Sequence, residues 1–279
     1  MAYKSILVVV DSGPRAAQNV EFALNLARTF EARVTGLFAA TLPTGVVGFD
    51  GAYVPDPYTM LTQQLGEQAA AAKAVFEAEV AKVYGVLTEW REQIGSAITA
   101  VCVNARYHDL VIMGQYDPHH PQSGTPVDLV ESVVLGSGRP VLVVPYAGDF
   151  PHVGRNVLVG WDTGREATRA VTDALPLLRK AGRTTVMTVG PEVSETAHGE
   201  SSGSDIALFL ARQGVKVEVK REPGIGLNVG GLMLSVAADL NADLIVMGLY
   251  GHSRLRELML GGASRTILQT MTVPVLMSH

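Results

Sequence analysis

The sequence contains two copies of one pattern, and this internal repeat limits the possible folds more than any other feature. Both copies place an apolar run before an aspartate, followed by an arginine and an alanine-rich amphipathic stretch. Three segments recur: residues 5–13 (SILVVVDSG) match 156–164 (NVLVGWDTG), 109–116 (DLVIMGQY) match 243–250 (DLIVMGLY), and 139–144 (RPVLVV) match 273–277 (VPVLM). Because self-similarity at a fixed period reflects a repeated structural unit, the sequence predicts two domains of one fold.

The spacing of the copies predicts where the domains begin and end. The offset between aligned residues falls from 151 (Asp11 to Asp162) to 134 (Gly114 to Gly248), so the first copy contains an additional segment. We assign it to residues 41–60, which are rich in Gly, Pro and Tyr as a loop insertion would be. Prolines and glycines between Pro145 and Gly154 predict a linker, which gives domains at residues 1–147 and 155–279.

Short β-branched runs alternate with longer segments of helical period in each copy, the pattern of right-handed βαβ units. We therefore expect in each domain a five-stranded, mainly parallel sheet with helices on both faces. The expected strands lie near residues 5–10, 33–39, 85–90, 109–113 and 140–144, and near 156–161, 183–189, 215–220, 243–247 and 273–277. Helices are expected between the strands, among them an alanine-rich one at about 62–84 and one at 266–271.

Composition supports this class of fold and excludes others. Hydrophobic residues make up 47% of the chain and charged residues 18%, which suits strands covered on both faces. The net charge of −5 and the lack of any Lys/Arg run argue against a nucleic-acid partner. The single Cys102 excludes an intramolecular disulfide. Neither a signal-peptide core nor a long apolar span is found, which predicts a cytoplasmic protein without a membrane partner.

The strongest local signal follows the second DLIVMG strand. Gly248 and Gly251 come at the end of that strand, and residues 261–264 (GGAS) precede a predicted helix. Glycines at the carboxyl end of a parallel strand allow close approach of the backbone to a ligand, and N–H groups at a helix start surround phosphate oxygens. Ligands of open α/β sheets bind at this edge.

At this point the chain resembles the universal stress protein family, whose nucleotide motif is Gly, two residues, Gly, nine residues, Gly, then Ser or Thr. Gly248, Gly251 and Gly261 meet that spacing, whereas Gly262 stands where Ser or Thr is usual. Ser264 supplies a hydroxyl two places later. The resemblance covers nearly the whole chain and implies two tandem Rossmann-like domains of the adenine nucleotide alpha hydrolase-like fold.

The resemblance also implies which residues bind the nucleotide in the second copy. A carboxylate that ends the first strand lies near adenine and ribose in the family, and Asp162 matches it. Backbone groups near Thr188 and Val189 match those that contact adenine. The predicted site is Asp162, Thr163, Val189, Met247, Gly248, Gly251, His252, Gly261, Gly262, Ala263 and Ser264. Its ligand would be ATP, ADP or AMP, bound either with or without Mg²⁺.

The first copy has lost most of this motif. It keeps Asp11 and Gly114, but prolines at 118, 121 and 126 remove amide donors from the equivalent stretch. We therefore interpret the first site as degenerate and Asp11 as a helix cap. His119 and His120 could ligate a metal, although solvated loop histidines are the simpler interpretation, and no metal site is predicted.

These observations favour a stress-response or regulatory protein that binds an adenine nucleotide in its second domain and acts on a protein partner still to be identified. A slow ATP-hydrolysing or nucleotidyl-transfer enzyme, with Asp162 and Ser264 serving Mg²⁺-ATP, is the first alternative. A nucleotide-free dimerisation scaffold is the second. The apolar last strands of the two copies are expected to pair, since exposed edges are a liability, which predicts an internal pseudo-dimer and leaves a homodimer open.

Overall fold

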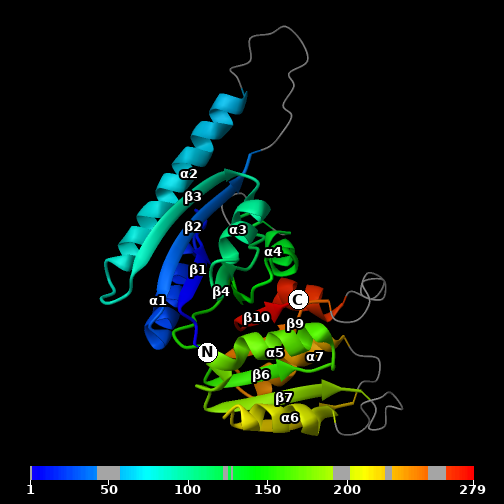
Figure 1. The fold of residues 1–279 in the computed structure, drawn as a ribbon. Coiled ribbons are helices and arrows are strands. Elements are labelled where there is room, and N and C mark those ends of the chain that lie inside the picture. Colours follow the sequence, from blue (N-terminus) through cyan, green and yellow to red (C-terminus); the bar gives the residue numbers. More distant parts are fainter. Residues whose placement is uncertain are drawn as a thin grey trace. The chain divides into compact units, whose positions relative to one another are not determined.

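Strands and helices alternate along the chain in the computed structural model (Figure 1). The structure describes residues 2–42, 57–121, 125–126, 128–190, 202–223, 228–250 and 262–279. The chain divides into two compact units, Tyr3–Ser137 and Gly138–His279 with Met1–Ala2, here called the N-terminal and the C-terminal unit. Within the described residues each repeat contributes five strands, as predicted.

The N-terminal unit is a parallel sheet with a pair of helices on each face (Figure 1). Its strand order is β3-β2-β1-β4. Helix α1 packs against α2, and α3 packs against α4. The elements are β1 (Ser5–Val9), α1 (Ala16–Phe30), β2 (Arg33–Thr41), α2 (Pro57–Val80), β3 (Thr88–Gly95), α3 (Ala97–Ala105), β4 (Leu110–Gly114) and α4 (Leu129–Ser137).

The C-terminal unit repeats this arrangement and includes the last strand of the first repeat. Its strand order is β5-β10-β9-β6-β7-β8. The elements are β5 (Val141–Val144), β6 (Asn156–Gly160), α5 (Arg165–Leu178), β7 (Arg183–Val189), α6 (Ser202–Arg212), β8 (Val217–Glu222), α7 (Val229–Asp239), β9 (Leu244–Gly248), α9 (Ala263–Thr270) and β10 (Val275–Ser278). Strand β5 runs antiparallel to β10, with Val143 opposite Val275, so the predicted pairing of the two last strands is confirmed.

Apolar runs without alternation form the central strands. Every residue of β4, β5 and β10 is buried, as expected for strands covered on both faces. Burial of each large side chain there, such as Ile112 or Leu276, contributes about 2 kcal/mol. Cys102 is also buried in α3, and burial raises the pKa of its thiol.

Strand β3 lies further along the chain than predicted. The sequence suggested residues 85–90, whereas the strand spans Thr88–Gly95. The preceding residues form a turn in which Gly85 has φ of +82°, so the apolar Val86 and Leu87 that drew the prediction precede the strand. Helix boundaries also move by a few residues: α2 begins at Pro57 and α9 at Ala263, earlier than expected.

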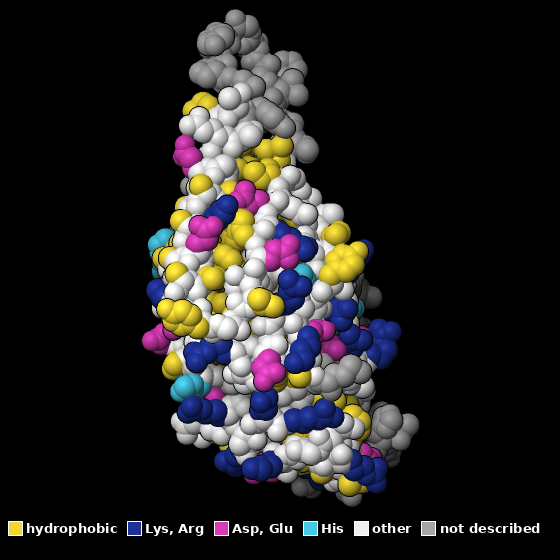
Figure 2. All heavy atoms as spheres, turned by 60° about the vertical axis from the view of Figure 1, so that its left-hand side comes forward, with side chains coloured by type: hydrophobic (Ala, Val, Ile, Leu, Met, Phe, Trp, Pro, Cys, Tyr) yellow, Lys and Arg dark blue, Asp and Glu magenta, His cyan; other side chains and the backbone are white. Residues whose placement is uncertain are grey.

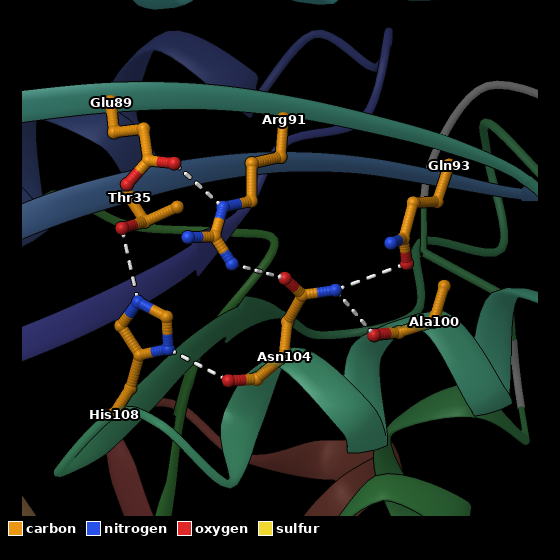
Figure 3. A network of polar contacts seen from close by, with 7 residues as sticks. All are labelled: Thr35, Glu89, Arg91, Gln93, Ala100, Asn104 and His108. Atoms are coloured by element: carbon orange, nitrogen blue, oxygen red, sulfur yellow. Dashed lines mark hydrogen bonds and ion pairs between the residues drawn. The ribbon is translucent and has the colours of Figure 1, made fainter.

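A network of polar side chains lies between the sheet and α3 in the N-terminal unit (Figure 3). His108 is buried, and its Nδ1 lies 2.8 Å from the Asn104 carbonyl oxygen, which can only accept. Its Nε2 therefore accepts from the Thr35 hydroxyl at 3.0 Å when the ring is neutral. The Asn104 side chain accepts from Arg91 at 2.8 Å and donates to Gln93 at 3.0 Å.

The second repeat satisfies the same strand positions differently. Thr185 stands at the β7 position that Thr35 occupies in β2, and it donates to Glu218 of β8 at 2.8 Å. The β3 counterpart of Glu218 is Glu89, which instead accepts from Arg91 at 2.8 Å. The Thr35 hydroxyl is thus bonded to His108 in the first repeat, whereas the equivalent Thr185 hydroxyl is bonded to a carboxylate in the second.

Candidate nucleotide-binding site

Three strand ends and three helix starts meet at the carboxyl edge of the C-terminal sheet. Strands β6, β7 and β9 are parallel and end at Gly160, Val189 and Gly248. Helices α5, α7 and α9 begin at this same edge. Of the predicted site residues, the structure describes eight here, while Gly251, His252 and Gly261 lie outside the described residues.

Asp162 lies in the turn between β6 and α5. Its side chain is exposed, and Oδ1 accepts from the Gly164 backbone N–H at 2.8 Å. Thr163 between them has φ of +66°, a conformation that a β-branched residue rarely adopts. A Cβ at Gly164 would lie 2.9 Å from Asp162 Oδ1, so a larger residue there would displace the carboxylate. The turn holds the Asp162 carboxylate at the edge of the sheet.

Gly248 has a packing role that the sequence did not indicate. A Cβ at this position would lie 2.6 Å from the backbone of Glu166 and Ala167 in the first turn of α5. The space beside this glycine is therefore taken by α5, whereas the sequence interpretation gave it to a ligand. The neighbouring Met247 is buried, and Val189 is half-buried at the end of β7. A nucleotide contact to these three residues stays a prediction.

Helix α9 begins at Gly262 without a side-chain cap. Gly262 is its N-cap residue, with φ of −40° and ψ of 156°, and no side-chain hydrogen bond from the described residues caps the helix. Ser264 is buried, and its Oγ accepts from the Tyr250 backbone N–H at 3.2 Å, which ties the start of α9 to the end of β9. Tyr250 has φ of +59°. The N–H groups of the first turn, Ala263 included, are donors suited to an anion.

Trp161 was not singled out from the sequence. Its indole Nε1 is buried and has no hydrogen-bond partner within the described part of the chain. Its backbone N–H donates to the Met187 carbonyl at 2.9 Å, which fixes the residue between β6 and β7 next to Asp162. An unpaired buried donor costs about 1–3 kcal/mol unless a partner is present. A ligand or water at this edge would satisfy it.

Helix α7 contributes a second feature that sequence reasoning missed. Asn228 caps α7, because its Oδ1 accepts from the N–H groups of Gly230 and Gly231, and its Nδ2 donates to Thr266 of α9 at 3.1 Å. A Cβ at Gly230 would lie 2.8 Å from the Ala263 carbonyl oxygen. Gly230 therefore sets the close contact of α7 with α9. The sequence signal was the asparagine two residues before a glycine pair, typical of an N-cap.

The corresponding edge of the N-terminal unit is filled by its own side chains. Asp11 accepts from the Gly13 N–H at 2.9 Å and from the buried Thr125 hydroxyl at 3.2 Å. Burial raises the pKa of the Asp11 carboxyl, and these hydrogen bonds only partly oppose the effect. A Cβ at Gly114 would lie 2.7 Å from Nδ2 of Asn19, which is itself buried. The expectation that Asp11 caps the following helix is wrong: Asp11 bonds Gly13 in the turn before α1, and the N-cap residue of α1 is Arg15, whose side chain makes no capping hydrogen bond.

The two histidines of the first copy lie beside a carboxylate. Asp117 is buried; its Oδ1 accepts from the His119 backbone N–H at 2.8 Å, and its Oδ2 lies 3.0 Å from His120 Nδ1. These contacts lower the pKa of the Asp117 carboxyl against the opposing effect of burial. Among the described residues, no group of three or more His, Cys, Asp and Glu side chains is placed to hold a metal ion.

The model of the universal stress protein family matches residues 2–145 and again residues 154–279. The chain belongs to the universal stress protein family. It consists of two tandem universal stress protein domains of Rossmann-like, adenine nucleotide alpha hydrolase-like fold, as predicted. Comparison with the curated proteins gives no match.

Solved structures of other universal stress proteins have the same fold over the whole chain. A universal stress protein from Archaeoglobus fulgidus DSM 4304 matches with a TM-score of 0.71 at 19% identity, covering 98% of this chain and 95% of that one. A putative universal stress protein from Pseudomonas aeruginosa UCBPP-PA14 matches with a TM-score of 0.60 at 17% identity, covering 99% and 93%. At these identities the likeness shows the fold alone. No helix within the described residues is long and apolar enough to cross a membrane.

Proposed function

We propose that this universal stress protein binds an adenine nucleotide, ATP or its ADP and AMP forms, in its second domain, residues 155–279. The first domain, residues 1–147, would have lost its site. Nucleotide occupancy would control stability or the choice of a protein partner in a stress or regulatory response.

One observation carries the proposal most: the start of α9 has no side-chain cap. The N-cap is Gly262, so the helix begins with N–H groups that no side chain of the described residues caps, next to the family's glycine motif. The positive end of a helix dipole adds an attraction for phosphate of about 0.3–1 kcal/mol. The equivalent residue before α4 is Asp128, 134 positions earlier, whose carboxylate would repel phosphate.

The residues at the edge fit the different parts of a nucleotide. Phosphate oxygens would accept from the first-turn N–H groups of α9, with the Ser264 proton as a further donor. The exposed Asp162 carboxylate suits ribose hydroxyls, because it has acceptors to offer. The unpaired Trp161 indole N–H would donate to a ring nitrogen or to an ordered water. When bound with ATP, Mg²⁺ would neutralise part of the phosphate charge.

Exchanging the N-cap residues of the two repeats tests this assignment. Gly262→Asp gives α9 a good helix cap and a negative charge, so the fold is kept while at least about tenfold of affinity for Mg²⁺-ATP is lost. The reciprocal Asp128→Gly should leave the affinity unchanged. Isothermal titration calorimetry measures both. Equal affinity of Gly262→Asp and the parent would show that the phosphates do not lie at α9.

A further inference from the structure

Six cationic side chains meet at the amino edge of the C-terminal sheet, the edge opposite to the candidate nucleotide site. They come from three separate segments, and all are exposed: Arg155, Arg179, Lys180, Arg183, Arg212 and Lys216. Because β6, β7 and β8 are parallel, the turns that precede them lie at one edge. Figure 2 shows the Lys and Arg side chains gathered over this unit, in the lower part of the view. We call these six residues the basic edge.

Hydrogen bonds between the turns show that the basic edge is continuous. The Arg183 N–H donates to the Arg155 carbonyl at 3.1 Å, and the Thr184 N–H donates to the Lys216 carbonyl at 2.9 Å. Arg179 Nε donates to the Gln213 carbonyl at 2.9 Å, which holds the end of α5 against the turn after α6. The basic edge therefore spans the starts of three adjacent strands.

Acidic side chains neutralise only part of this charge. Glu218, Asp239 and Asp243 lie on the same edge and Asp149 lies in the linker to β6, so six positive and four negative charges leave a net +2 on a chain of net −5. Glu218 pairs with Arg183 at 2.8 Å, and Asp243 accepts from backbone N–H groups at 3.0 Å. Within the described residues, no ion pair or hydrogen bond engages the charged groups of Arg155, Arg212 or Lys216.

Exposed apolar side chains lie beside the basic edge on α6. Leu208 is 51% exposed and Phe209 is 40% exposed, whereas Ile206 and Leu210 are buried. Arg212 follows Leu208 by four positions and Phe209 by three, so these three residues share the outer face of the helix. The surface thus combines cations with two large apolar groups.

We propose that the basic edge, with Leu208 and Phe209, docks an acidic segment of a partner protein that also carries apolar side chains. Arginine forks bind carboxylates in bidentate geometry, and aromatic and arginine residues are enriched in protein interfaces. The negative charge of the whole chain opposes a long polyanion such as nucleic acid. A short peptide responds mainly to charges within about 8 Å, the screening distance at physiological salt.

A pair of charge-matched variants tests the location of this surface. The probe is a short fluorescein-labelled peptide of Asp, Glu, Leu and Phe, followed by fluorescence anisotropy. Arg212→Glu with Lys216→Glu should weaken binding about tenfold or more, as removal of interface charges does. The control, Arg28→Glu with Lys73→Glu, changes the net charge equally on exposed helix positions of the N-terminal unit and should have little effect. Equal losses in both variants, or no binding by the parent, would overturn the proposal.

Two further measurements test the class of partner and its independence of the nucleotide. Phe209→Ser should weaken binding of the Leu/Phe peptide but not of one with glycine in place of Leu and Phe. Tighter binding of a DNA duplex or of phosphatidylserine vesicles than of the peptide would contradict an acidic protein partner. Gly262→Asp should retain peptide binding, because the basic edge lies away from α9. The peptide result therefore tests the basic edge even if the nucleotide proposal fails.

Discussion

Asp11 and Asp162 occupy the same place in the two repeats and have opposite surroundings. Asp162 is exposed, whereas Asp11 is closed in by Thr125 and the start of α1. Burial raises the pKa of the Asp11 carboxyl because it disfavours the charged form. The same residue type is therefore an exposed carboxylate in one repeat and a half-buried carboxyl with a raised pKa in the other.

We expect Asp11→Asn to stabilise the N-terminal unit by about 1 kcal/mol at neutral pH, since the amide keeps the Gly13 hydrogen bond without burying a charge. A raised folded pKa means that the parent gains stability as the pH falls and Asp11 takes a proton. The advantage of the variant should therefore shrink toward pH 4. Urea unfolding in a Trp161→Phe background, in which Trp90 reports on this unit, measures both effects. A constant advantage across pH would contradict the account.

For His108 we expect the opposite pH dependence of the stability of the N-terminal unit. Burial, with the nearby Arg91 charge, lowers the pKa of its imidazole below the ordinary value of 6.5, while Asn104, Glu89 and Asp109 favour the proton. The unfolded chain binds this proton more readily, so the unit loses stability as the pH falls through 6.5 toward the lower folded value. In His108→Gln the free energy of unfolding, measured by urea denaturation, should fall less between pH 7.5 and pH 5 than in the parent. Equal slopes would show that His108 does not contribute.

At the scale of elements, the contact of α7 with α9 determines where the uncapped helix start lies. Gly230→Ala should destabilise the C-terminal unit by about 1–3 kcal/mol, because its Cβ would overlap the Ala263 carbonyl and the Thr266 side chain. Gly231→Ala is the matched control: its nearest neighbour would be 3.9 Å away, and alanine favours a helix. Thermal unfolding followed by Trp161 fluorescence separates the two. Similar melting temperatures for both variants would rule out this packing role.

The sequence predicted the positions of the strands well where apolar runs are fully buried, as in β4 and β5, because a short, continuous apolar run bounded by turns is typical of a buried strand. It failed for β3, whose polar edge residues look like a loop. At the site it identified Asp162 and the α9 start from their positions in the repeat. It could not anticipate that Gly248 accommodates α5, or that Trp161 lacks a partner, because both depend on contacts between distant segments.

At the scale of the whole molecule, duplication has produced two edges of unequal chemistry. The first repeat has Asp128 at its helix start and places Asn19 and Thr125 around Gly114. The second repeat has Gly262 at its helix start and an exposed Asp162. The central claim is therefore that the chain has two domains but only one nucleotide site, which lies in the second domain.

The stoichiometry of ATP binding to the full chain tests this claim most directly. Calorimetric titration of the parent with Mg²⁺-ATP, after removal of any co-purified nucleotide, should give about one site per chain, because α9 starts after a glycine whereas its counterpart α4 starts after Asp128. The same titration of Gly262→Asp should give an affinity at least about tenfold weaker. Two sites in the parent, or one undiminished site in Gly262→Asp, would contradict the account.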